Sequence, residues 1–278
     1  MADGKGRGQR GPGVSGKEGV YMDSEIENGA NLGNYTRIGH VNPAAVVDTI
    51  ALFCDRISPP GILWVHSCLS VEELNTESFE RNLAGIDQSV QHLARAGAQF
   101  IIVGGSPVVR WKGTGFHQEL MDRMETLTGV PTTTTQRAAI DALQHLGVQR
   151  LAVATPYEAA VNERTQAFLG ESGFTVLGVK GLGMRKAVDM SNVLPETSYR
   201  LARAVVEENP GAEAVYFPCA RWPVIDNIAR LEAELGIPVV TSVQSMLWAA
   251  LKGFEWWEPV VGYGRLLEGL SRNGHNRA

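Results

Sequence analysis

The chain has 278 residues, of which 44% are hydrophobic and 20% charged, and these proportions are typical of a globular protein of one or two domains. Its formal net charge of −5 argues against a nucleic-acid-binding surface, and no apolar run reaches the roughly 18 residues that a membrane helix needs. The three cysteines, at positions 54, 68 and 219, fit neither a disulfide framework nor a zinc site, and no leader is apparent. We therefore expect free thiols in a cytoplasmic protein.

Residues 1–34 are rich in glycine and poor in apolar side chains, so they are predicted to form a disordered tail. After this tail, short apolar runs alternate with helical patterns. The predicted strands are residues 38–41, 62–66, 100–103, 131–134, 151–154, 175–179, 214–217 and 239–241. The clearest predicted helices are residues 79–94, 159–170 and 197–208. Regular alternation of strand and helix indicates parallel sheets with helices on both faces.

The chain also repeats itself. Residues 97–107 and 211–221 have the same order of turn, hydrophobic strand and loop, and the distance from Pro43 to Gly105 is within one residue of that from Pro156 to Cys219. We predict an α/β fold of two similar doubly wound parallel-sheet domains, related by internal duplication, with the active site in the cleft between them. The first domain is predicted to comprise residues 35–146 plus 243–278, and the second residues 147–242.

Ligands of open parallel sheets bind beyond the carboxyl ends of the strands. Pro43, Gly105, Tyr157 and Cys219 all fall at such positions. In the duplicated frame Gly105 matches Cys219, so the two are expected on opposite walls of the cleft. Only one wall then has a thiol.

Several of these residues suit acid–base chemistry on a carboxylic acid. Cys219 precedes a stretch that is predicted to begin a helix, and amides at a helix N-terminus lower a thiol's pKa; a cysteine that merely packs in the core is the alternative. Gly105 and Ser106 offer backbone amides and a hydroxyl to a carboxylate or enediolate oxygen, or they form only a tight turn. Tyr157 could donate to an oxyanion or cap the edge of the core.

The other candidate ligands are predicted to be structural. Cys54 lies in an apolar helical stretch and is expected in the core. Cys68 ends a strand, and we expect it to pack in the structure rather than to line the cleft. The six histidines show no i, i+4 pairing and no companion ligands. No metal site is predicted.

Four segments, residues 103–106, 127–133, 154–164 and 235–242, together resemble the aspartate/glutamate racemase superfamily. They are most similar to its branch of arylmalonate decarboxylases and maleate cis-trans isomerases, and the similarity runs from about residue 37 to residue 267. Racemases and maleate isomerases of this superfamily use two cysteines, one on each wall of the cleft. The decarboxylases, like this chain, have a glycine in place of the first, here Gly105.

The resemblance implies a cofactor-independent lyase. One carboxylate of a substituted malonate would be held in an oxyanion hole, the other would leave as CO2 from an apolar pocket, and Cys219 would protonate the enediolate. By position, Ser106 stands for the family's threonine, Tyr157 matches its tyrosine and Ala220 stands for a glycine.

Two departures from the family pattern affect the site. Pro107 replaces a serine and has neither a hydroxyl nor an amide hydrogen, so oxyanion donors are lost. Arg221 replaces a small residue; it either binds a carboxylate or points to solvent, and its charge is expected to lower the pKa of the neighbouring thiol.

These departures keep two alternatives open. The first is a cis-trans isomerase or racemase of a small carboxylic acid that uses one thiol and a different second group such as Ser106. The second is a non-catalytic carboxylate-binding protein. In each case the predicted partner is a small carboxylic acid, without nucleic acid, membrane or cofactor, and a homo-oligomer is compatible with the sequence.

Overall fold

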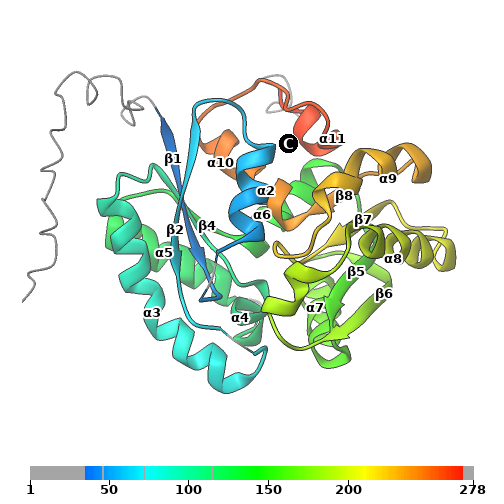
Figure 1. Ribbon diagram of the computed structural model, residues 1–278, viewed down its shortest axis with the longest axis horizontal. Coiled ribbons are helices and arrows are strands. Elements are labelled where there is room, and N and C mark those ends of the chain that lie inside the picture. The colour runs from blue at the N-terminus through cyan, green and yellow to red at the C-terminus, as the bar shows by residue number, and fades with distance from the viewer. Residues whose placement is uncertain (1–34, 46, 72, 114, 272–278) are drawn as a thin grey trace, which may run out of the picture. The chain divides into compact units, whose positions relative to one another are not determined.

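The computed structural model describes residues 35–271 apart from 46, 72 and 114, and without the side chains of 108, 110 and 111. The tail predicted at residues 1–34 lies outside this range. The described residues from Thr36 to Ser271 form one compact unit. Within this unit, two groups of strands lie side by side, each flanked by helices (Figure 1).

Each group of strands is a four-stranded parallel sheet, and the two sheets have the same strand order. The first has the order β2-β1-β3-β4 and the second β6-β5-β7-β8. Their strands are β1 (Thr36–Asn42), β2 (Ile62–Cys68), β3 (Phe100–Val103), β4 (Thr132–Thr134), β5 (Arg150–Tyr157), β6 (Thr175–Met184), β7 (Ala214–Phe217) and β8 (Val239–Thr241). The matching order confirms the predicted α/β fold of two similar parallel sheets.

The helices follow the strands in alternation. They are α2 (Thr49–Ile57), α3 (Thr76–Arg95), α4 (Ser106–Trp111), α5 (Phe116–Thr128), α6 (Thr135–His145), α7 (Ala159–Glu171), α8 (Pro195–Glu208), α9 (Ile228–Leu235), α10 (Ser242–Gly253) and α11 (Arg265–Glu268), with 3-10 turns at Val188–Asn192 and Ile225–Asn227. The three helices predicted from periodicity are present as α3, α7 and α8. In α3, Asn75 caps the amide of Ser78 at 3.0 Å and an apolar face packs on the first sheet.

One hydrophobic core joins the two sheets. Alternate residues of the first sheet, such as Ile38 and Ile102, lie in the same buried cluster as the strands of the second sheet and as α10. The intervening residues, such as Ile101 and Val103, face α3 and α5 on the other side. Because the core is shared, the carboxyl ends of both sheets are held in place relative to each other.

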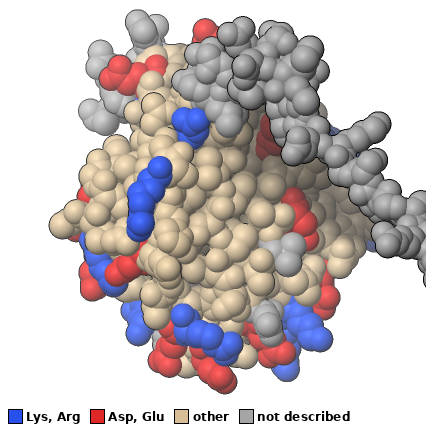
Figure 2. Space-filling view, turned by 60° about the vertical axis from the view of Figure 1, so that its left-hand side comes forward, with Lys and Arg blue, Asp and Glu red and all other residues tan. Residues whose placement is uncertain are grey.

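The surface has charges of both signs. On the face shown in Figure 2, lysine and arginine side chains occur next to aspartate and glutamate around a broad uncharged area. Within the part of the chain that the structure describes, no helix combines the length and apolar character needed to cross a membrane. Cytoplasmic location and oligomeric state stay predictions.

Gly104 fixes the end of β3 against the end of β1. A Cβ atom at this position would lie 2.5 Å from the carbonyl oxygen of Val41 and 2.7 Å from Nε2 of His40. The Gly104 amide also donates to that Val41 oxygen at 2.9 Å. The chain therefore approaches β1 here as closely as only glycine allows.

We predict that Gly104→Ala lowers the free energy of unfolding by about 1–3 kcal/mol, because the added methyl group overpacks the junction of β1 and β3. Urea denaturation measures the change. Gly170→Ala is the matched control: none of the described atoms would lie within 4 Å of its Cβ, and alanine in α7 should raise stability by up to about 1 kcal/mol. Equal stability of Gly104→Ala and wild type would contradict the proposed packing.

Candidate active site

A pocket lies where the loops at the carboxyl ends of the two sheets meet. Its volume is about 550 Å³ when the open solvent at its mouth is included. The structure places every residue of the predicted site on its wall: Pro43, Gly105 and Ser106 from the first half, and Tyr157, Cys219, Ala220 and Arg221 from the second. The roles of these residues stay predictions, but the duplicated frame correctly predicted that they lie together.

The Cys219 side chain is buried, with 6% of its surface exposed. Burial raises the pKa of its thiol. Hydrogen bonds from Tyr157 and from the amides of Arg221 and Trp222 favour the thiolate, as does the charge of Arg221, but burial has the larger effect. The charge of Arg221 lowers the pKa as predicted, but burial, which the sequence did not reveal, reverses the net direction. The thiol stays protonated at neutral pH and points its hydrogen toward Sδ of Met190, 4.0 Å away.

The expected helix N-terminus beside the thiol is also absent from the described residues. The chain after Cys219 forms a turn and a 3-10 segment at Ile225–Asn227, and α9 begins only at Ile228. The amides that face the thiol come from that turn instead. Pro223 would fall in the first turn of the predicted helix, where proline is accommodated, so it does not explain why the helix begins later.

Tyr157 ends β5 and is 3% exposed. Its hydroxyl donates to the carbonyl oxygen of Pro218 at 2.8 Å and is also within hydrogen-bonding reach of the Cys219 sulfur. Since a phenol has a single O–H, it donates to one of these acceptors at a time. Tyr157 thus both positions the loop before the thiol and can stabilise a thiolate when one forms.

The opposite wall is the turn from β3 into α4. Gly105 has a φ of +89°, a conformation that favours glycine, and Ser106 begins α4. Gln136 of α6 donates to the Ser106 carbonyl oxygen through Nε2. Pro107 occupies the first turn of α4, where an amide hydrogen has no partner within the helix, so proline is accommodated structurally.

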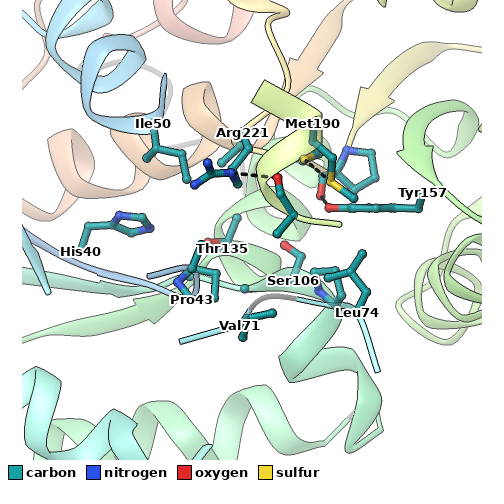
Figure 3. A pocket seen from close by; sticks show the side chains of 18 residues that line it. His40, Pro43, Ile50, Val71, Leu74, Ser106, Thr135, Tyr157, Met190 and Arg221 are labelled. Atoms are coloured by element: carbon teal, nitrogen blue, oxygen red, sulfur yellow. Dashed lines mark hydrogen bonds between the residues drawn. The ribbon is translucent and has the colours of Figure 1, made fainter. Parts of the chain in front are cut away.

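Of the two alternatives predicted for Arg221, the structure excludes the one in which its side chain points to solvent. Arg221 is 5% exposed, and Nε donates to the carbonyl oxygen of Ala187 at 3.1 Å. Nη2 lies 3.0 and 3.2 Å from the two carboxylate oxygens of Asp48. Figure 3 shows its side chain extending along the pocket toward Ile50. Asp48 was not anticipated from the sequence.

Sequence reasoning also missed His40, which lines the pocket from β1. Its Nδ1 lies 3.1 Å from Nδ1 of His66, its register partner on β2. Burial lowers the pKa of His40 to about 3 and that of His66 to about 4, so both rings are neutral and one Nδ1 donates to the other. The pairing of the two predicted strands in parallel register was the signal that could have revealed this contact.

Much of the remaining wall is apolar. Ile50 comes from α2, Val71 and Leu74 from the chain after β2, and Ala187 and Met190 from the chain after β6 (Figure 3). In the sequence these side chains are indistinguishable from core residues. They surround the polar groups with surface that excludes water.

The other two cysteines lie outside the pocket lining. Cys54 is fully buried in the core, as predicted, whereas Cys68 is exposed at the end of β2, contrary to the packing that was favoured for it. Among residues 35–271, leaving out the gaps, no group of three histidine, cysteine or acidic side chains is arranged as metal ligands would be.

Comparison with known proteins identifies the family. A model of the arylmalonate decarboxylase family matches residues 55–267. The arylmalonate decarboxylase of Bordetella bronchiseptica is 30% identical over 212 residues, which cover 75% of this chain and 88% of that protein. The maleate isomerase of Pseudomonas putida is 24% identical over 220 residues, covering 77% and 87%.

Solved structures agree. One match is the liganded form of an arylmalonate decarboxylase variant in which a glycine is replaced by cysteine and a cysteine by serine. Its TM-score is 0.78 and its sequence identity 27%, and the match covers 84% of this chain and 99% of that chain. The maleate isomerase of Pseudomonas putida with maleate matches with a TM-score of 0.77 and 20% identity, over 84% and 98%, and so supports the fold alone. As the four sequence segments predicted, the chain belongs to the arylmalonate decarboxylase family of the aspartate/glutamate racemase superfamily.

Proposed function

We propose that the protein is a cofactor-independent decarboxylase of a substituted malonate-type acid, in which Cys219 protonates the enediolate intermediate. The observation that carries this proposal is the asymmetry of the pocket. Among its described lining residues there is a single thiol, buried and protonated, and Gly105 occupies the matching position on the other wall. A single acid suits protonation from one side, whereas two-thiol racemisation needs a second.

The carboxylate that the product retains must be held while it accumulates charge. Backbone amides of the two facing loops, at Ser106 and Ala220, and the Ser106 hydroxyl are available for this purpose. Donors that are already oriented stabilise developing charge without reorganising during the reaction. Pro107 contributes no donor, so fewer groups share this role than in a site with serine there.

The carboxylate that leaves is better placed among apolar side chains. The pocket lining includes such side chains, among them Val71, Leu74 and Met190. There a carboxylate loses its hydration, whereas CO2 is neutral and loses little. The bond between the α-carbon and this carboxylate breaks, and its electron pair passes to the retained carboxylate, which becomes an enediolate.

Proton transfer completes the reaction. The Cys219 S–H bond breaks, its proton forms a C–H bond at the α-carbon, and the thiolate left behind regains a proton from water. The raised pKa keeps the thiol loaded with its proton beforehand. Tyr157 and the amides of Arg221 and Trp222 then stabilise the transient thiolate.

A cis-trans isomerase or racemase is the second candidate, and two observations favour it. His40 is a titratable group on the first-half wall, and maleate isomerases are among the relatives. A pKa of about 3 makes this imidazole a weak base, so we rank decarboxylation first. Assays of α-aryl-α-methylmalonate, maleate and chiral acids for CO2, double-bond geometry and optical rotation separate these activities from simple carboxylate binding.

We predict that Cys219→Ala reduces decarboxylation of α-aryl-α-methylmalonate about 100- to 10,000-fold, the usual contribution of a positioned general acid. CO2 release under single-turnover conditions measures this change. Cys68→Ala is the matched control, because it removes a thiol that is exposed and outside the pocket lining, and it should keep wild-type activity. Full activity in Cys219→Ala would exclude the thiol as proton donor.

The pH dependence follows from the same thiol. Cys219 must be protonated to act, and its raised pKa extends the protonated form to higher pH. The rate should therefore hold constant past pH ~8.5, where an ordinary thiol ionises, and decline only at more alkaline pH. Measurement of kcat/KM against pH tests this expectation. If kcat/KM instead declines with a midpoint below pH ~8.5, burial does not raise the pKa of the Cys219 thiol as we infer.

A further inference from the structure

Arg221 gives the pocket its one fixed charge. Among the described residues that line the pocket, it alone is permanently charged, since His40 is neutral and Cys219 is protonated. Its side chain is 6% exposed. A guanidinium in such surroundings is stable only with a close counter-charge.

Asp48 supplies that counter-charge from outside the pocket lining. Its two carboxylate oxygens lie 3.0 and 3.2 Å from Nη2 of Arg221, while 47% of its side chain is exposed to solvent. The ion pair therefore runs from the pocket wall to the surface. The carboxylate of Asp48 thus balances the charge of Arg221 from outside the wall.

The position of Asp48 is fixed independently of Arg221. As the N-cap of α2, it accepts from the Thr49 amide at 2.6 Å and from the Thr49 hydroxyl at 3.1 Å. That hydroxyl also lies 3.3 Å from the Arg221 carbonyl oxygen and 3.0 Å from the hydroxyl of Ser191. The first turn of α2 is thus joined to the loops that follow β6 and β7.

We infer that Asp48 is a specificity-determining residue, which neutralises Arg221 and so limits the affinity of the pocket for a second carboxylate, including the one that the substrate loses as CO2. The inference deepens the proposed function and rests on it, because it assumes that the pocket binds a small carboxylic acid. During decarboxylation the negative charge gathers on one retained carboxylate. A ligand with two permanent carboxylates keeps charge at both ends.

The physical reason is that electrostatic attraction scales with ligand charge. An unpaired Arg221 would attract a dianion about twice as strongly as a monoanion at the same distance, and a low-dielectric pocket magnifies the difference. It would also stabilise the departing carboxylate in its charged form, which opposes loss of CO2. With Asp48 present, neither effect operates at full strength.

The test compares the affinities of succinate and butyrate, which differ by one carboxylate and undergo no decarboxylation. In Asp48→Asn, the Kd of succinate should fall about tenfold or more relative to the Kd of butyrate, measured by calorimetry. Asparagine caps helices as well as aspartate does, so α2 is preserved, and Asp48→Ser, which also keeps a capping oxygen, should give the same result.

Two further variants isolate the interaction. Adding Arg221→Gln to Asp48→Asn should abolish the gain in succinate selectivity, because the attracting charge is gone. Glu158→Gln is the matched control: it removes the carboxylate that accepts from Arg185 at 2.7 Å, and Glu158 is not among the described residues that line the pocket. It should leave the ratio of the two affinities unchanged.

The outcomes separate the two proposals. If wild type releases CO2 from an arylmalonate but Asp48→Asn leaves the ratio of affinities unchanged, Asp48 does not set specificity and the proposed function stands. Asp48 is equally excluded from this role if Glu158→Gln shifts the ratio as much as Asp48→Asn does. If no carboxylate binds to wild type or to any variant, both proposals are overturned.

Discussion

Parallel pairing within both sheets dictates where chemistry can occur. Each strand runs in the direction of its neighbours, so the chain leaves every strand at the same edge and the connecting loops gather there. The hydrophobic core shared by α10, Ile38 and the second sheet holds the two edges in a fixed relation. The pocket, its thiol and its paired arginine all depend on this arrangement.

Burial then decides the state of each ionisable group in the pocket. It keeps Cys219 protonated and His40 neutral, and it makes the Arg221 guanidinium depend on Asp48. The site itself therefore has almost no net charge, although it is lined by a thiol, an imidazole and a guanidinium. Charge that develops during the proposed reaction would lie first on the substrate and then on the Cys219 thiolate, and the oriented amides and hydroxyls would stabilise it.

The asymmetry between the halves has a basis in the backbone. Gly105 adopts a φ of +89°, which a residue with a side chain rarely adopts, and the preceding Gly104 is held against β1. A cysteine at position 105 would therefore require a rearranged loop as well as a changed side chain. The second half has no such restriction at Cys219, where Tyr157 supports the loop through the Pro218 carbonyl oxygen.

The sequence by itself determined the alternation of strands and helices, the duplication and the family, because these depend on local patterns and on short motifs. It also predicted that Pro43, Gly105 and Cys219 come together, since the ends of parallel strands share one edge. Only the tertiary structure decided the direction of the thiol's pKa shift and the partner of Arg221. Asp48 and Arg221 lie 173 positions apart, and His40 and His66 lie 26 apart. Burial and such distant contacts arise only when the whole chain has folded.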